Sequence, residues 1–597
     1  MSRILQTCAS TLVLANVATA GESPAPVKWR VIEPWHDPAG RQVFTHGGSI
    51  MSWDGMLHLR PDTPLGQYLG QFHEWGFNGI ALGCDPDDNP EAFRAFCQYL
   101  KPMGISVFIR RDWHEIETGK SWPLRPSDGR PRTSPKLNPF SAEVRAYWEQ
   151  RITRDYELFP EIAGYRMSGT EFYFCNGAPW MGEGPEMVGK TGRECVRAAL
   201  QLVANELGKH SGTLFWETCQ DDGWGQRQEL WYFRDLTGEI PANAFILIKD
   251  HYWDYHPGWP LNPLDYVITR DAQGNSPYLT SIQLPGEYTG VNDFPWCHVD
   301  EIAGTMKEIV ATGQQGIWVV ALPLPKSPWD HPLNVVNWYA VSELMKNPLA
   351  DPQALKMAWA KAEYGEAAAN TVVDILTKVT EASRGIYEFD TLFSGIHSRF
   401  PSLPYLDSHL CGPIRQATRM KGMMGVALPL DMYPPEVAAQ IRANPQTRLV
   451  FNQVPITARL KSEAMAQKDG AVQRMNEAIA LWQALRGKLD EARYTQILAG
   501  LKGNLNDTIA FQHMMDLYMD WKLGTLTEAK IDAALAACQG LKGIAVPELL
   551  DPDPKKVTSV EPASLKTFAE ELRRELRQPS LEEYWRLHPN PHVTYLP

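Results

Sequence analysis

The chain has 597 residues, of which 44% are hydrophobic and 21% are charged, a balance that is ordinary for a folded globular protein. Its formal net charge is −13 at pH 7. This acidic balance disfavours binding to nucleic acid and to anionic membranes, both of which attract basic faces. The length exceeds that of a usual single domain, so we expect one large barrel-type domain and a second unit.

The first 20 residues are typical of a secretory signal peptide. Arg3 supplies the positive start, an apolar stretch follows, and Ala-Thr-Ala at 18–20 forms a small-residue cleavage site before Gly21. No other segment approaches the ~18 uninterrupted apolar residues of a membrane helix. We therefore expect a secreted or periplasmic protein that is cleaved near Ala20–Gly21 and has no membrane anchor.

The cysteines beyond the predicted signal peptide are scattered along the chain. They include no Cys-x-x-Cys pair and no zinc-ligand spacing, and no His-x-x-x-His pair accompanies them. We expect most of them to be free, buried thiols, and we expect neither a metal nor another cofactor. These cysteines are Cys84, Cys97, Cys175, Cys195, Cys219, Cys297, Cys411 and Cys538.

Residues 41–345 alternate short β-rich runs with helix-like stretches, which is the pattern of repeated βα units. Eight strands close a (β/α)8 TIM barrel. An open doubly wound sheet is the main alternative, but no Gly-rich phosphate loop follows the first predicted strand. Residues 21–40 would be an N-terminal extension. The strands are expected at 45–53, 76–83, 104–111, 162–169, 212–218, 244–250, 278–284 and 316–322.

Residues 346–597 lose the β pattern and predict an all-α C-terminal domain. Between 471 and 490, apolar residues recur at helical spacing with charged residues between them. The stretches 350–385, 494–522, 526–541 and 562–577 follow the same pattern. We expect this helical domain to pack on the barrel.

Acidic residues lie at the ends of four predicted strands. Glu171 follows the fourth strand, Glu217 ends the fifth, Asp254 follows the sixth and Glu287 follows the seventh. Barrel enzymes carry their active sites at this end of the strands. Glycoside hydrolysis needs one protonated carboxyl group and one ionised carboxylate, so Glu171, Asp254 and Glu287 are our candidate catalytic residues.

The neighbours of these carboxylates suggest their roles, although any single acid at a strand end is more often a helix cap or an ion-pair partner. The aromatic run 172–174 beside Glu171 would favour a protonated acid. Lys249, five residues before Asp254, would favour an ionised group or contact the substrate.

Tryptophans and histidines near the strand ends are candidate substrate contacts. Flat indole rings stack on sugars, but in large proteins tryptophan equally often fills the core, and both readings stay open. Histidines there are more often hydrogen-bonded rim residues than ligands; His251 is the one we assign to the substrate. The tryptophans are Trp113, Trp216, Trp224, Trp253 and Trp296, of which we assign all except Trp224 to the substrate site.

The segments around the candidate catalytic residues resemble motifs of the family 67 glycoside hydrolases, the α-glucuronidases. ILIKDHYWDY (246–255) and SIQLPGEYTG (281–290) are similar to the two base-bearing motifs of that family, with Lys249 five positions before Asp254 and a Gln-x-x-x-Glu-Tyr pattern around Glu287. IAGYRMSGTEF (162–172) is similar to the segment that bears the general acid, and 337–365 to the passage into the helical domain.

The resemblance implies an inverting mechanism, in which Glu171 protonates the glycosidic oxygen while Asp254 and Glu287 activate water. The family carries a β-sandwich domain ahead of its barrel, for which residues 1–40 leave no room, so the chain would be a divergent relative. That family often dimerises through its helical domain, which makes a homodimer possible here. The implied partner is a carbohydrate, from which an α-linked glucuronic acid or related sugar would be removed.

The uronate-binding cations of the family are only partly present. Lys249 matches, whereas Met167, beside Arg166, replaces a Lys and Glu217 replaces an Arg. We assign Lys249, Arg166 and Glu217 to the substrate-binding site. An acid at position 217 would repel a substrate carboxylate. Two alternatives stay open: a retaining glycosidase with Glu287 as the nucleophile, and a non-catalytic carbohydrate-binding barrel.

Overall fold

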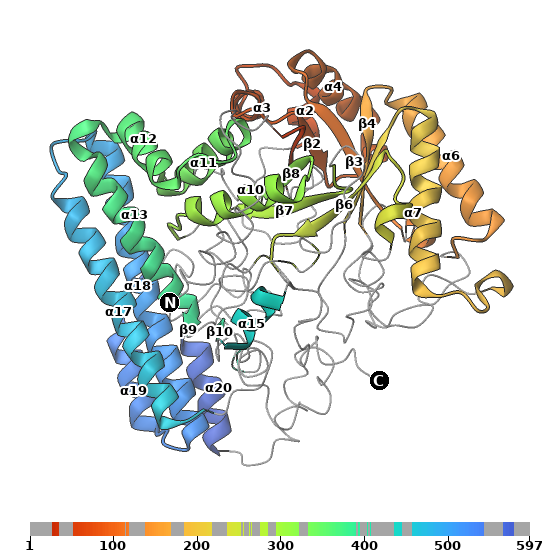
Figure 1. The fold of residues 1–597 in the computed structure, drawn as a ribbon. Coiled ribbons are helices and arrows are strands. Elements are labelled where there is room, and N and C mark those ends of the chain that lie inside the picture. The colour runs from red at the N-terminus through yellow and green to blue at the C-terminus, as the bar shows by residue number, and fades with distance from the viewer. Residues whose placement is uncertain are drawn as a thin grey trace.

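The structure is a computed structural model, and eight of its strands form one closed barrel in sequential order with every pair parallel (Figure 1). Parallel closure of eight strands gives the (β/α)8 barrel that the sequence predicts. The described residues are 27–34, 52–113, 115–118, 138–168, 184–217, 236–251, 255, 262, 264, 275–284, 294–321, 332–389, 392–393, 403, 406, 435–443, 456–542 and 565–577.

Seven of the eight strands lie where the sequence predicts them, but the first one does not. The first strand is formed by WRVIEP at 29–34, inside the stretch predicted to be an N-terminal extension. The strand predicted at 45–53 is wrong at its last residue, because Trp53 begins a helix. The barrel thus begins before residue 41. The strands are β1 (Trp29–Pro34), β2 (Gly79–Leu82), β3 (Ser106–Asp112), β4 (Ile162–Ser168), β5 (Thr213–Glu217), β6 (Ala244–Lys249), β7 (Tyr278–Leu284) and β8 (Gly316–Ala321).

The helices of the barrel region begin and end with clear local signals. The longest, α7, starts with a capping box in which Thr191 and Glu194 satisfy each other's backbone N–H groups, and α10 ends at Gly313 in the left-handed conformation. The helices are α2 (Trp53–Leu57), α3 (Pro64–Glu74), α4 (Pro90–Leu100), α5 (Glu115–Thr118), α6 (Ala142–Leu158), α7 (Gly192–Lys209), α10 (Val299–Thr312) and α11 (Val335–Lys346).

Alternate residues of each strand point into the barrel, and the interior layer near the strand starts is apolar. Trp29 makes edge-to-face contacts with Phe108 and Phe215, with ring centroids 5.8 and 5.4 Å apart. Phe215 also stacks on Phe245 at 5.6 Å. Two residues further along β3 and β5 the inward positions become Arg110 and Glu217, and on β6 Lys249 follows Phe245 by four residues, after Leu247. The barrel interior is therefore aromatic near the strand starts and charged near the strand ends.

A β-bulge determines which residues of β4 point into the barrel. The register with β3 passes from Val107–Ile162 to Phe108–Gly164, so one residue of β4 is skipped. Gly164 has a φ of +144°, and a Cβ built there would lie 1.9 Å from the carbonyl oxygen of Thr213. Only glycine fits this close approach. The shift pairs Arg166 with Arg110, so that both side chains face the interior.

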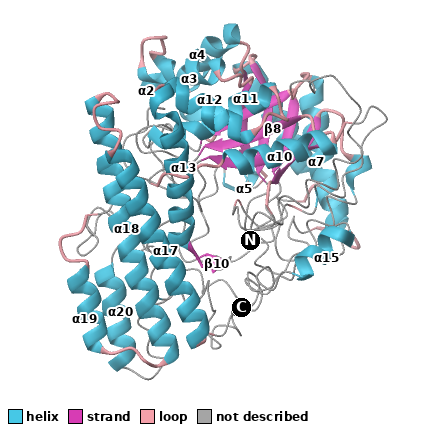
Figure 2. Ribbon diagram, turned by 60° about the vertical axis from the view of Figure 1, so that its left-hand side comes forward, coloured by secondary structure: helices cyan, strands magenta, loops and turns pink. Residues whose placement is uncertain are grey.

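The C-terminal region is helical, with long helices packed side by side (Figure 2). Helices α13, α17 and α18 form its centre, and one small hairpin, β9–β10, departs from the predicted all-α composition. The elements are α12 (Pro352–Tyr364), α13 (Glu366–Tyr387), β9 (Glu388–Phe389), β10 (Leu392–Phe393), α15 (Pro435–Ala443), α17 (Ala458–Gln483), α18 (Glu491–Leu523), α19 (Glu528–Ala537) and α20 (Leu565–Arg577).

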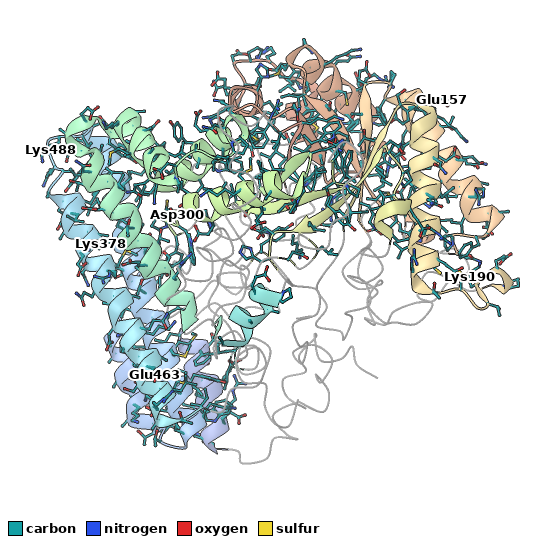
Figure 3. All side chains as sticks on the ribbon, viewed as in Figure 1. Glu157, Lys190, Asp300, Lys378, Glu463 and Lys488 are labelled. Carbon is teal, nitrogen blue, oxygen red and sulfur yellow. The ribbon has the colours of Figure 1, made fainter. Side chains whose placement is uncertain are left out.

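The segment 294–298, which precedes α10, is held by hydrogen bonds to the helices that follow the barrel. Asn334 accepts from the N–H of Trp296 at 2.8 Å and donates to the carbonyl of Phe294 at 3.0 Å. Ser383 of α13 donates to the carbonyl of Pro295 at 3.1 Å. Asp300, in the first turn of α10, pairs with Lys356 of α12 at 3.0 Å (Figure 3). The barrel and the helical region are thus joined by polar contacts.

The described cysteines agree with the prediction of free thiols. Cys84, Cys97, Cys195, Cys297 and Cys538 are unpaired by disulfides and buried; the other cysteines and the predicted signal peptide lie outside the described residues. Within the described part of the chain, no helix has the length and apolar character to cross a membrane.

Replacing Gly164 with alanine tests the bulge. Because the new methyl group meets the Thr213 backbone and φ is positive, we expect the free energy of unfolding to fall by roughly 2–6 kcal/mol. Urea unfolding of the full chain measures it. Gly304→Ala in α10 is the control, since nothing lies within 4 Å of a Cβ there. A Gly164→Ala protein as stable as the control would contradict the assigned strain.

Glu571 of α20 should make stability depend on pH. Burial raises its pKa from 4.5 to about 7, and its carboxylate accepts from the N–H of Leu403 at 2.8 Å. Between pH 4.5 and 7 the unfolded state ionises first, so stability is full below that window and about 3 kcal/mol is lost as pH rises through it. We expect Glu571→Gln, followed by urea unfolding at pH 5 and pH 8, to remove this loss. Glu570→Gln, an exposed neighbour, should leave it unchanged.

Candidate active site at the barrel end

The three predicted catalytic residues, Glu171, Asp254 and Glu287, lie outside the described residues, as does Trp253. The strands that precede them are all confirmed. Ser168, Lys249 and Leu284 are the last residues of β4, β6 and β7, and they lie at the same end of one parallel barrel. The catalytic assignments therefore stay predictions, made for segments that follow three strands ending on a common rim.

Glu33, at the end of β1, is the centre of a buried polar network. One of its carboxylate oxygens accepts from Trp318 Nε1 of β8 at 2.8 Å and from Arg166 Nε of β4 at 3.2 Å. The other accepts from an Arg110 guanidinium nitrogen of β3 at 3.4 Å. Only 1% of the Glu33 side chain is exposed. The sequence pattern does not single out Glu33, because it predicts the first strand at 45–53 rather than at 29–34.

Glu217, the acid expected to repel a substrate carboxylate, is paired with a cation. Its carboxylate lies 2.5 Å from an Arg166 guanidinium nitrogen. Burial disfavours the charge on Arg166, but attraction by Glu217 and Glu33 outweighs it and holds the Arg166 pKa above its ordinary value. The negative charge at position 217 is thus compensated within the barrel, and Arg166 is used for that compensation.

Arg110 faces the same interior, and its pKa shifts in the opposite direction to that of Arg166. Burial, reinforced by repulsion from Arg166, lowers the pKa of Arg110 to about 10, although Glu33, Glu217 and Asp112 oppose the shift. The guanidinium remains charged at neutral pH. About 10% of the Arg110 side chain is exposed, whereas none of Arg166 is.

The end of β6 carries Lys249 and His251, both predicted to contact the substrate, and both are buried. The Lys249 ammonium lies 5.1 Å from the ring centroid of Tyr255, within cation–π distance. His251 Nδ1 lies 3.0 Å from the carboxylate of Asp250. The Lys249 carbonyl accepts from the amide of Asn262 at 3.0 Å. These contacts hold the strand end in place.

The described tryptophans of the predicted substrate site lie in the core. Trp113 stacks on Trp148 of α6 with ring centroids 5.6 Å apart and planes 12° apart, and Trp216 lies 6.3 Å from Trp113. Trp296 stacks on His298 at 5.7 Å. At most 1% of Trp113, Trp216 or Trp296 is exposed. The structure supports the core-packing role that the sequence left open for them.

A second charged network lies outside the barrel, because Arg111 points away from the interior that Arg110 faces. Arg111 donates to Asp155 of α6 at 2.7 Å, and Tyr165 of β4 donates to the same oxygen at 2.5 Å. All three side chains are fully buried. This network fastens α6 to the strands. Among the described residues, no group of three or more His, Cys, Asp or Glu residues could hold a metal ion.

Replacing Glu33 with glutamine tests the network. The change leaves Arg110 and Arg166 buried with less negative charge, so we expect the free energy of unfolding to fall by roughly 3 kcal/mol. Urea unfolding followed by tryptophan fluorescence measures it. The control is Glu343→Gln, which removes a surface ion pair with Lys346 and should cost at most about 1 kcal/mol. Equal effects of the two changes would argue against a compensating role for Glu33.

The comparisons with known proteins support the resemblance that the motifs indicate. No family model matches the chain. It is 23% identical over 559 residues to α-glucuronidase A of Emericella nidulans, covering 81% of this chain and 61% of that protein. It is also 23% identical to the α-glucuronidase of Hypocrea jecorina, with the same coverage. The chain thus spans less than two thirds of the length of these relatives.

Among solved structures, a family GH138 enzyme targeting pectin rhamnogalacturonan II aligns with a TM-score of 0.51 at 11% identity, covering 94% of this chain and 68% of that one. At this identity the match concerns the fold alone. The predicted resemblance to α-glucuronidases is therefore confirmed by similarity over about four fifths of the chain.

Proposed function

We propose that this protein is a glycoside hydrolase that removes an α-linked sugar, glucuronic acid or a related residue, from an oligosaccharide or polysaccharide side chain. The proposal rests on one observation, which is that the motifs lie where the fold places an active site. The three segments similar to the catalytic motifs of α-glucuronidases follow β4, β6 and β7, whose ends meet on one barrel rim. Overall similarity to α-glucuronidases supports the same conclusion.

In the proposed inverting mechanism, Glu171 gives its proton to the glycosidic oxygen as the bond to the sugar breaks. Asp254 and Glu287 take a proton from water on the opposite face of the sugar, and that water forms the new bond to the anomeric carbon. Before each turnover Glu171 must be protonated, and the carboxylates that activate water must be ionised. The paired side chains of Glu33, Arg166 and Glu217 would lie inside the barrel directly beneath the bound sugar.

The proposal includes export of the mature protein after cleavage near Gly21 and a carbohydrate as its partner. The positive start, apolar stretch and small-residue cleavage site of the first 20 residues support export, and the motif similarity supports a carbohydrate partner. A homodimer rests on the family resemblance alone. Intact-mass measurement of the exported protein and light scattering would test these points directly.

Replacing Glu171 with glutamine should lower kcat on an oligosaccharide with an α-linked D-glucuronosyl group by about 10²–10⁴-fold while sugar binding persists, because the sugar alkoxide that leaves needs a proton and the amide cannot deliver it. ¹H NMR of the reaction gives both the rate and the anomer formed first. Inversion predicts that the wild-type protein releases the β-anomer.

The control for this experiment is Glu157→Gln, which changes an exposed acid of α6 (Figure 3). An α-anomer as the first product would favour the retaining alternative with Glu287 as the nucleophile. A wild-type protein that binds glycans but cleaves none would favour the non-catalytic barrel. Full activity of Glu171→Gln would exclude Glu171 as the acid.

A further inference from the structure

We propose that Tyr255 is a positioning residue, whose hydroxyl group bonds to Ser281 of β7 and thereby fixes the segment that carries Asp254 beside the strand that leads to Glu287. The inference rests on the proposed function, in which Asp254 and Glu287 together activate water. It goes beyond that function because the proposed mechanism gives no role to Tyr255, which directly follows the predicted base in the chain.

The side chain of Tyr255 lies inside the barrel. Only 6% of the residue is exposed, and it belongs to the same apolar cluster as Phe245 and Leu247, the inward residues of β6. The strand itself ends at Lys249. The chain therefore leaves the end of β6 and then returns a large aromatic ring to the barrel interior. A ring held in this way restrains the backbone beside it, and Asp254 is the residue directly before it.

The hydroxyl group of Tyr255 reaches the neighbouring strand. It shares a hydrogen bond with the Ser281 hydroxyl, and both residues are buried. Ser281 is in register with Lys249 across β6 and β7, and it lies two residues after Leu279, an inward residue of β7. The bond therefore joins the segment after β6 to the interior face of β7, and it satisfies a polar group that burial would otherwise penalise.

The ring of Tyr255 is held separately from its hydroxyl group. The Lys249 ammonium lies 5.1 Å from the ring centroid, within cation–π distance. Ring and hydroxyl are thus contacted by residues that face each other on two paired strands, and contacts from two strands define both the place of the side chain and its tilt. Removal of the hydroxyl group alone leaves the contact with Lys249 intact, which makes Tyr255→Phe a selective change.

Two backbone anchors flank Tyr255 along the chain. Asn262, which is fully buried, donates from its side-chain amide to the Lys249 carbonyl at 3.0 Å and from its backbone N–H to the Asp250 carbonyl at 3.1 Å. The N–H of Asp250 donates in turn to the Ser281 carbonyl at 2.9 Å. The stretch that includes Asp254 is therefore fixed at positions 250, 255 and 262, and two of these three contacts are made to Ser281.

Activation of one water molecule by two carboxylates requires that both groups be placed accurately. A displacement of about 1 Å can lower a rate by 10²-fold. Glu287 comes after β7 in the same chain segment as Ser281, so the bond between Tyr255 and Ser281 connects the stretch that carries one carboxylate to the strand that leads to the other. Since Tyr255 acts through Asp254 and not on the sugar, its effect should fall on kcat and not on substrate binding.

The test measures kcat and KM of the full chain on an oligosaccharide with an α-linked D-glucuronosyl group, using wild type, Y255F and S281A. We expect Y255F to lower kcat by roughly 10- to 100-fold and to change KM by less than about twofold. S281A should act in the same way. The double variant should be no slower than the slower single variant, because both changes remove the same bond.

D254N separates positioning from a general structural effect. Adding Y255F to D254N should change the residual rate by less than about twofold, whereas an equal loss with and without Asp254 overturns the inference. The matched control is Y147F, which removes a hydroxyl group that donates to Glu115 at 3.3 Å outside the barrel and should leave kcat unchanged. Thermal unfolding confirms that each variant is folded. If Y255F does not fold, S281A decides: a lower kcat at unchanged KM supports the inference, and an unchanged kcat overturns it.

Failure of this inference can be told apart from failure of the proposed function, because amide hydrogen exchange of peptide 250–264 reports on the anchor without turnover. Y255F should exchange there roughly 5- to 10-fold faster than wild type. A hydrolytically active wild type with unchanged kcat in Y255F overturns only the role of Tyr255. A wild type that cleaves no glycoside overturns the hydrolase assignment, and exchange then decides on Tyr255: faster exchange in Y255F supports the anchor, and equal exchange overturns it.

Discussion

The barrel depends on one buried carboxylate, Glu33, and on the requirement that its charge be compensated. Its hydrogen-bond donors come from β3, β4 and β8, so a residue near the start of the chain connects the first strand to the last and to two others. Trp318 is 285 positions away in sequence. An unpaired carboxylate at this depth would cost several kcal/mol, so closure of the barrel and neutralisation of the charge must be achieved together.

The interior around Glu33 is divided by the two-residue period of the strands. Aromatic rings fill the layer near the strand starts, and the charged side chains of Glu33, Arg110 and Glu217 lie nearer the strand ends. The bulge at Gly164 makes the same arrangement possible in β4, since without it Arg166 would point outward, as Arg111 does in β3. A single glycine thus decides which of the two charged networks this arginine joins.

Much of the fold could be predicted from the sequence, because near-continuous apolar runs such as those of β6 and β8 are typical of strands buried on both faces. WRVIEP was missed because Arg30 and Glu33 interrupt its apolar character; the charge on Glu33 is satisfied by residues remote in sequence. For the same reason the pairing of Glu217 with Arg166 could not be foreseen, and Trp113 and Trp216 gave no local sign of their burial. The roles of Glu171, Asp254 and Glu287 come from motifs and remain proposals.

The anchoring of segment 294–298 has a consequence for how this architecture could evolve. Asn334 and Ser383 fix the chain between β7 and α10, and one continuous apolar cluster extends from the outer face of the barrel through α11, α12 and α13 to Trp482 and Leu501. The helical region is therefore not an appended module that recombination could exchange for another. The barrel and the adjoining parts of the helices share one core, and substitutions on either side of it are expected to accumulate in concert.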